Sequence, residues 1–459
     1  MKDTVIKVLL PLFFLAISIS GFSQLQPVYE FQQDDTILRK SFYEQALQKQ
    51  KTLLSSIGNE HKDDYKRVYE SRFNGVSAVL QSSRTVSAKE PHEYLQGILK
   101  KITDSNKELQ DLQVRLVFSR DWWPNAYSMG EGTLVVNAGL MVFLENEAEL
   151  VFVLCHELAH YYLQHGDKDI KKNVETVNSE AFKLELKRLS KEEFRIGQQL
   201  EALFKNLAFD NRRHSRANEA EADRYAFQFM KKTGYDCNGI ISCLKMLDRV
   251  DDSLLYRPIS VEQVFNFKEY PFKKRWIQKE SAIFSQMKED DSPLTKKERD
   301  SLKTHPDCDI RIILLEDSIK MNSTGQAFLV NEPLFKKLKK DFFVEMTEQE
   351  FRDKNLTRNL YYSLLMLQND VNVPFAIYSI ARALNEVYES QEKHEIGKVT
   401  AKENRRNRED YNLLLRMIDR LRLDEIAELN YQFCNYYQLQ MTGYKGFEEE
   451  LQKAQQNKK

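Results

Sequence analysis

The spacing of apolar residues along the chain predicts a mainly helical protein with one short region of strands. Residues 24 to about 90 are polar, contain few Gly or Pro, and are expected to be helical. The apolar positions from Glu93 to Ile102 suit an amphipathic helix. The period then shortens to two between Leu112 and Phe118, which predicts a strand, and a second strand is expected from Thr133 to Asn137.

Longer helical patterns follow the strands. A helix with a buried face is predicted from Asn146 to His165, and a charged helical insertion from about 167 to 212. A further helix is expected from about Arg216 to Lys232, because Gly234 is a good C-terminal cap. The stretch from about 260 to 300 is charged and is also expected to be mostly helical.

The last part of the chain, beyond about residue 320, is predicted to be helical throughout. Two pairs of apolar-faced helices are expected there, Leu360 to Leu367 with Phe375 to Tyr388, and Tyr411 to Leu421 with Glu425 to Tyr437. Paired helices of this size resemble tetratricopeptide units, although no fixed repeat period is present. A helical domain without true repeats is the alternative.

The first two dozen residues have the layout of a secretory signal peptide. A basic start at Lys2 and Lys7 precedes an apolar run from Val8 to Ile19, and small residues then precede a possible cut before Gln24. The apolar run is shorter than the roughly 20 residues of a membrane span, so an uncleaved anchor is the less favoured alternative. We therefore expect an exported, periplasmic protein without a transmembrane segment in its mature chain.

Composition and charge narrow the class of protein. Hydrophobic residues make up 42% of the chain and charged residues 30%, which suits a globular protein, and the net charge of -1 gives no reason to expect nucleic-acid binding. The five cysteines do not indicate a disulfide scaffold. Cys237 and Cys243 are candidates for one disulfide, with separate small core residues as the alternative.

The central chemical signal is the segment His156-Glu157-Leu158-Ala159-His160 inside an apolar helical stretch. Residues four apart lie on one helix face, so the two imidazoles can bind one zinc ion, and Glu157 beside them can take a proton from water. Two satisfied histidines are the alternative. However, such a polar set in a buried helix is costly unless it is paired or binds a metal.

A second polar segment, Glu219-Ala220-Glu221-Ala222-Asp223, can complete this site. A catalytic zinc needs a third protein ligand and an open position. Glu219 and Asp223 share a helix face, so Glu219 is the candidate third ligand and Asp223 the group that holds a ligand histidine by a hydrogen bond. Glu221 points away and is expected to face solvent. Taken alone, this segment also fits an ordinary charged helix.

Together these segments resemble the family of zinc peptidases that includes HtpX, BepA and the CAAX prenyl endopeptidases. The resemblance covers roughly residues 95 to 315. The matching segments are Asn125 to Ser128 with Gly130, Leu134 to Leu140, Glu147 to His160, His165-Gly166, Arg216 to Asp223, and Thr304 to Arg311. Because no later segment is apolar enough to be transmembrane, the chain is closer to the soluble periplasmic members with tetratricopeptide-like repeats.

The resemblance implies an α+β, mainly helical fold, with a zincin-like catalytic domain that contains a small sheet and an edge strand, followed by an all-α C-terminal domain. It implies one Zn2+ per chain, bound by His156, His160 and Glu219, with Glu157 as the catalytic base. The expected units are a signal peptide at 1–23, a helical segment at 24–92, the peptidase domain at 93–318 and the helical domain at 319–459.

The resemblance also suggests roles outside the zinc ligands. The edge strand would consist of Thr133, Leu134, Val135, Val136 and Asn137 and would hold a peptide by β-addition. His305 would stabilise the tetrahedral oxyanion, or cap the zinc and keep the enzyme latent, or simply pack on Pro306. Arg311 is expected to pair with a carboxylate near the site.

Two functions stay open on the sequence alone. The first is an exported zinc-dependent endopeptidase that acts on peptides or unfolded proteins in envelope protein quality control. The second is a chaperone or assembly scaffold whose C-terminal helices bind an envelope protein while the peptidase site stays latent. A structural zinc site fits poorly, because such sites usually use four Cys or His ligands.

Overall fold

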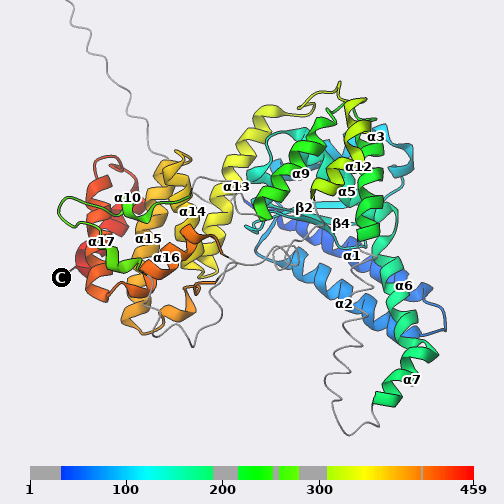
Figure 1. The fold of residues 1–459 in the computed structure, drawn as a ribbon, viewed down its shortest axis with the longest axis horizontal. Helices are drawn as coiled ribbons and strands as arrows, with labels where there is room; N and C mark the ends of the chain where they lie inside the picture. The colour runs from blue at the N-terminus through cyan, green and yellow to red at the C-terminus, as the bar shows by residue number, and fades with distance from the viewer. Residues whose placement is uncertain (1–32, 190–215, 252–257, 279–307, 405–406, 459) are drawn as a thin grey trace, which may run out of the picture.

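A four-stranded sheet lies at the centre of the N-terminal half of the chain (Figure 1). The computed structural model describes residues 33–189, 216–251, 258–278, 308–404 and 407–458. The strand order is β1-β2-β4-β3, with β2 and β4 parallel and each outer strand antiparallel to its neighbour. The strands are β1 (Thr85–Val86), β2 (Arg115–Ser119), β3 (Ala126–Ser128) and β4 (Thr133–Asn137).

Helices cover both faces of this sheet (Figure 1). One face carries the helices that build the site, and the other carries the N-terminal pair, α1 and α2. The first group is α3 (Lys89–Ser105), α4 (Ala138–Phe143), α5 (Glu147–Tyr162), α9 (Asn238–Asp251), α12 (Cys308–Lys320) and a helix over residues 216–230. The N-terminal pair is α1 (Thr36–Ser56) and α2 (Lys62–Gln81), and α6 (His165–Asn178) and α7 (Glu180–Leu189) extend beyond it.

The N-terminal helices are part of the packing of the sheet. Phe42 of α1 and Val76 and Leu80 of α2 form a small core with Val117 of β2 and Val135 of β4. Strands in which apolar and polar residues alternate usually expose one face to water. Here every residue of β2 and β4 is buried, because helices cover both faces of the sheet. The predicted helical segment therefore stabilises the central strands directly.

The expected edge strand is not at the edge of the sheet. β4, which contains Thr133, Leu134, Val135, Val136 and Asn137, pairs with β2 on one side and β3 on the other. Its backbone groups are thus used on both sides, so the prediction that it adds a peptide strand is wrong. Among the described residues, the edge strand on this side is β3, whose residues Ala126 to Ser128 pair with β4 alone.

In the part of the chain that the structure describes, the residues after 320 form a helical domain, as predicted. α14 packs on α15, and α15 also contacts α17 and α18. Among the described residues, no helix combines the length and the apolar composition of a membrane span. The helices are α13 (Glu332–Arg352), α14 (Leu356–Gln368), α15 (Val373–Glu392), α16 (Glu409–Arg420), α17 (Leu423–Tyr437) and α18 (Lys445–Asn457).

The two halves of the chain share more structure than the predicted boundaries imply. Arg120 follows β2 and donates from Nε to Glu345 of α13 at 2.9 Å, and both side chains are buried. Residues 258–278 lie within the predicted peptidase domain, yet they pack on the C-terminal helices. There the Ile259 N–H donates to Asp410 at 2.9 Å.

Residues 258–278 also differ from their predicted secondary structure. They contain only a single turn of helix, α10 (Val261–Val264), and the short 3-10 turn η2 (Lys274–Trp276). The prediction of a mostly helical stretch is wrong for these residues. Their aromatic side chains dock instead: Phe265 packs on Phe433, and Trp276 Nε1 donates to Glu425 at 3.2 Å.

Candidate metal centre

The helix that carries the histidine pair, α5, is fixed at its start. The Asn146 side chain caps it by accepting a backbone N–H of the first turn. Glu147 is fully buried and accepts three consecutive backbone N–H groups of residues 329–331 at 2.7 to 2.9 Å. The hydroxyl groups of Tyr94 and Tyr235 donate to the same carboxylate. These bonds anchor α5 nine residues before its first histidine.

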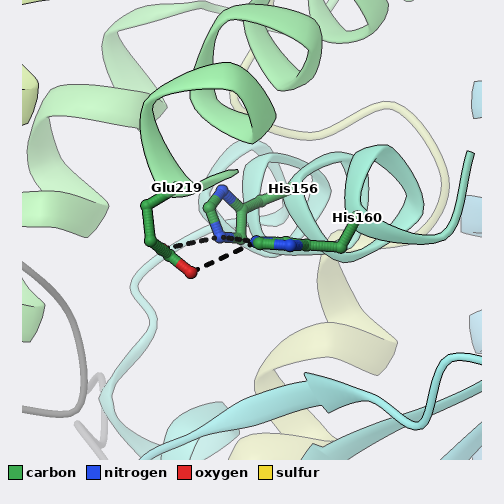
Figure 2. A group of neighbouring side chains, drawn as sticks. All are labelled: His156, His160 and Glu219. Carbon is green, nitrogen blue, oxygen red and sulfur yellow. Dashed lines mark hydrogen bonds and ion pairs between the residues drawn. The ribbon is translucent and has the colours of Figure 1, made fainter. Parts of the chain in front are cut away.

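Three predicted ligands converge on one point (Figure 2). His156 and His160 project from the same face of α5, and Glu219 reaches them from the neighbouring helix at 216–230. The two Nε2 atoms are 3.1 Å apart. Glu219 Oε2 lies 3.4 Å from His156 Nε2, and Glu219 Oε1 lies 3.3 Å from His160 Nε2.

These separations fit a zinc-sized ion. Ligand atoms placed tetrahedrally at about 2.0 to 2.1 Å from zinc are about 3.3 to 3.4 Å from one another. The two Nε2 atoms are 3.1 Å apart, and each has a Glu219 oxygen at 3.3 or 3.4 Å, Oε2 for His156 and Oε1 for His160, so the distances are close to that value. Two imidazoles and one carboxylate are also the donor set of a catalytic site, which leaves a fourth position open.

Asp223 contacts the first ligand, His156, at the ring nitrogen that faces away from the other two ligands. His156 Nδ1 lies 3.0 Å from Asp223 Oδ1, so the ring is oriented with Nε2 toward the other ligands. Arg311 of α12 donates from Nε and Nη2 to the two oxygens of Asp223, each at 2.6 Å. The structure thus places Asp223 beside a candidate ligand and Arg311 beside a carboxylate of the site.

The charges around His156 favour a cation at its ring. Burial alone would lower the pKa of His156, but hydrogen bonds to Asp223 and Glu219 raise it to about 10. Burial would raise the pKa of Asp223, yet the hydrogen bonds from Arg311 and His156 lower it to about 2. The raised pKa favours the imidazolium form of His156 in the metal-free protein, and a metal ion would satisfy the same negative surroundings.

The candidate base, Glu157, borders a small cavity next to the ligands. It is buried and lies one position along α5 from His156. The cavity has a volume of about 20 Å³, enough for a single water molecule. Ala126 of β3 also lines this cavity, so the edge strand and the candidate base border the same space.

A third histidine, not predicted to belong to the site, contacts the second ligand. His165 Nδ1 lies 2.9 Å from His160 Nδ1, and His165 Nε2 lies 3.1 Å from Glu221 Oε2. Glu221 was expected to face solvent, but its side chain is only 36% exposed and binds His165. A signal was present in the sequence, since His165 follows the second ligand by only five residues.

The remaining predicted site residue, His305, lies outside the described residues, as does Pro306. Its three possible roles therefore stay predictions. All five cysteines are buried free thiols, and Cys237 and Cys243 are not paired.

Comparison with known sequences places this geometry in a family. Residues 89–319, about half of the chain, match Peptidase family M48. The chain belongs to that family. The match begins with α3 and ends in α12, so it contains every described residue of the metal centre.

The chain is also similar to a curated metalloprotease. Over 131 residues, the chain is 30% identical to Metalloprotease YcaL of Escherichia coli (strain K12), an alignment that covers 28% of this chain and 48% of YcaL. The chain thus spans about half the length of this curated relative. α1, α2 and the helices from α13 onward lie outside the family match.

Proposed function

We propose that the protein is an exported zinc-dependent endopeptidase. The observation that carries this proposal is the set of His156, His160 and Glu219, whose ligand atoms all lie within 4.8 Å of one another, next to the buried side chain of Glu157. Membership of Peptidase family M48 supports it. One zinc ion per chain is expected, because a single group of this kind is found among the described residues.

Different residues of the chain have separate roles in the proposed peptide hydrolysis. Zinc, when bound, would lower the pKa of a coordinated water to about 7 and polarise a substrate carbonyl. Glu157 takes a proton from the attacking water and later gives it to the leaving amine. Asp223 holds the His156 ring in place, and Arg311 fixes Asp223.

The substrate is proposed to be an extended peptide or unfolded protein segment that pairs with β3. The Asn125 carbonyl accepts from the Asn137 N–H at 3.0 Å, and the Met129 N–H donates to the Thr133 carbonyl at 2.9 Å. The backbone groups of residues 125 and 129 therefore face β4. In an antiparallel ladder the intervening residues, Ala126 and Ser128, direct their N–H and C=O groups to the other side. A peptide strand added there would pass beside the cavity bordered by Glu157.

The proposal is tested with the mature chain from Gln24 onward and a casein or quenched-peptide substrate. Glu157→Gln is expected to keep one zinc per chain and to lose about 10²- to 10⁴-fold in rate. Glu149→Gln is the matched control, because Glu149 is a second buried glutamate of α5 that binds Ser242 instead of the site. Undiminished cleavage by zinc-loaded Glu157→Gln would exclude this mechanism.

Export and envelope quality control are part of the same proposal. Export is supported by the basic, apolar and small-residue order of the first 23 residues. Expression of the full chain in a Gram-negative host, followed by fractionation and N-terminal sequencing, tests export. A periplasmic product that begins at Gln24 is expected. A full-length product in the cytoplasm would contradict export.

A scaffold that binds an envelope protein through the C-terminal helices is the second candidate. A groove of about 510 Å³ favours it, because its lining combines aromatic rings with carboxamides that can bind a peptide backbone. Phe267, Tyr436 and Gln440 are among its lining residues, and Tyr436 is 69% exposed. Under this candidate function, Glu157→Gln would still suppress aggregation of an unfolded protein, and Tyr436→Ala would not.

A further inference from the structure

His160 is connected to a chain of two further side chains that lie outside the ligand set. His165 is 97% buried and its Nδ1 lies 2.9 Å from His160 Nδ1. Its other ring nitrogen, Nε2, lies 3.1 Å from Glu221 Oε2. Glu221 is on the same helix as the third ligand, Glu219, two residues further along. The contacts therefore close a ring of side chains between the two helices that carry the ligands.

A break in the helix makes this contact possible. In a continuous helix, residue 165 would lie about 140° around the axis from residue 160 and would point elsewhere. The chain instead leaves α5 at Tyr162, passes through Gln164 in the left-handed conformation (φ 56°), and begins α6 at His165. This turn folds the His165 ring back against His160.

The hydrogen-bond network assigns the ring protons. His160 Nε2 faces the other two ligands, 3.1 Å from His156 Nε2 and 3.3 Å from Glu219, so it must be free of hydrogen to bind a metal. The His160 proton is then on Nδ1 and is donated to His165 Nδ1. His165 consequently carries its own proton on Nε2 and donates it to the Glu221 carboxylate.

We propose that His165 and Glu221 are positioning residues that fix the ring and tautomer of His160 for metal binding. This inference rests on the proposed function and extends it. A ligand histidine commonly has its second ring nitrogen beside a carboxylate or a carbonyl, and His156 Nδ1 lies 3.0 Å from Asp223 Oδ1 in this way. For His160 the carboxylate acts through an intervening neutral imidazole.

The two ligand histidines thus have unequal support. Asp223 is 4% exposed and bidentate with Arg311, whereas Glu221 is 36% exposed. Water and small chelators reach the Glu221 end more easily. Metal release is therefore expected to begin at His160, and the rate of release should depend on His165 and Glu221.

The decisive measurement is the rate of zinc release to a chromogenic chelator, which does not depend on catalysis. His165→Phe keeps an aromatic ring but has no acceptor, and it should release zinc about 10- to 100-fold faster than the wild type. His165→Asn can accept from His160 and donate to Glu221, so it should recover most of the wild-type retention. Glu221→Gln, a change at the partly exposed end, should give an intermediate rate.

His92→Phe is the matched control, because His92 is a half-buried histidine of α3 that packs on Phe42 away from the site. Thermal unfolding of each metal-free variant shows whether it is folded. If His165→Phe fails to fold, the comparison of Glu221→Gln with the wild type still decides. Visible spectra of the cobalt-substituted proteins should show altered ligand geometry in His165→Phe and a nearly unchanged one in His165→Asn.

The possible failures are distinguishable. Equal zinc release by the wild type, His165→Phe and Glu221→Gln would overturn the positioning role of His165 and Glu221 and leave the peptidase proposal intact. Fast release by His165→Asn, as fast as by His165→Phe, would also overturn it, since packing and not hydrogen bonding would then explain the effect. A wild-type protein that binds no zinc would overturn both proposals.

Discussion

Arg311 and Asp223 form a buried, bidentate ion pair that connects α12 to the metal centre. Nε and Nη2 of Arg311 each lie 2.6 Å from an oxygen of Asp223, and the two side chains are 6% and 4% exposed. Asp223 in turn contacts His156 Nδ1 at 3.0 Å. A residue on α12, far along the chain from the histidines, therefore fixes the orientation of the first ligand.

Removal of one partner of this pair should be costly. Arg311→Met would leave a buried carboxylate without compensation, and the free energy of unfolding of the metal-free protein is expected to fall by about 3 to 5 kcal/mol. Urea denaturation measures it. Lys320→Met is the control, because its pair with Glu316 on the same helix is exposed and should contribute little. An unchanged urea midpoint for Arg311→Met would contradict this assignment.

The stability of the metal-free protein should fall at alkaline pH. The pKa of a histidine in the unfolded chain is about 6.5, whereas in the folded protein the pKa of His156 is raised to about 10. Because the folded state binds this proton more tightly, its contribution to stability is complete below about pH 6.5 and is lost as the pH rises to about 10. Urea unfolding in the presence of a chelator, repeated across this range, measures the effect.

Asp223→Asn is the control for this pH dependence. It removes a carboxylate that raises the pKa of His156 in the folded protein, so the loss of stability should again begin near pH 6.5 but end at a lower pH and be smaller in total. A wild-type unfolding free energy that stays constant across the alkaline range would contradict the predicted charge on His156.

The position of β3 at the sheet edge gives a prediction for substrate binding. Ser128→Pro removes an N–H that faces away from β4, so it should raise KM for a peptide while the fold stays nearly as stable. Tyr127→Pro removes an N–H of the ladder with β4 and should lower the free energy of unfolding as well. Kinetics and urea unfolding of both variants are the measurements. Equal KM values for Ser128→Pro and the wild type would exclude pairing of substrate with β3.

The parts of the site predicted from sequence are those set by local helix geometry. His156 and His160 share a face because they are four residues apart, and the same rule brings Glu219 and Asp223 together. The order of the strands was not predictable in this way. β3 has only three residues and no apolar alternation, so its pairing depends on contacts made by distant parts of the chain.

The His165 contact was missed for a related reason. The apolar pattern continues through Leu163, which indicates one helix up to His165, but the structure breaks the helix at Gln164. A single left-handed residue without glycine leaves little trace in the sequence. The burial of both faces of β2 and β4 was also not predictable from the strands themselves. Their second face is covered by helices that lie before the matched family region.

The loop from Asp121 to Asn125, which leads into β3, is held from two sides. On one side Gly139 approaches it so closely that a Cβ atom there would lie 1.9 Å from the Trp122 carbonyl oxygen. On the other side the Arg358 guanidinium of α14 lies 3.9 Å from the centre of the Trp122 ring and 4.4 Å from that of Tyr411. The helical domain therefore contacts the segment that positions the edge strand.

Loss of this contact should weaken substrate binding without loss of metal. Arg358→Leu removes the cation–π interaction, worth about 0.5 to 2 kcal/mol, and should raise KM for a peptide several-fold while zinc content is unchanged. Arg382→Leu is the matched control, since Arg382 stacks on Phe351 at 3.7 Å within the helical domain. It should lower the free energy of unfolding but leave KM unchanged. An equal rise of KM in both variants would indicate general loosening of the helical domain, because of these two arginines it is Arg358 that contacts the loop before β3.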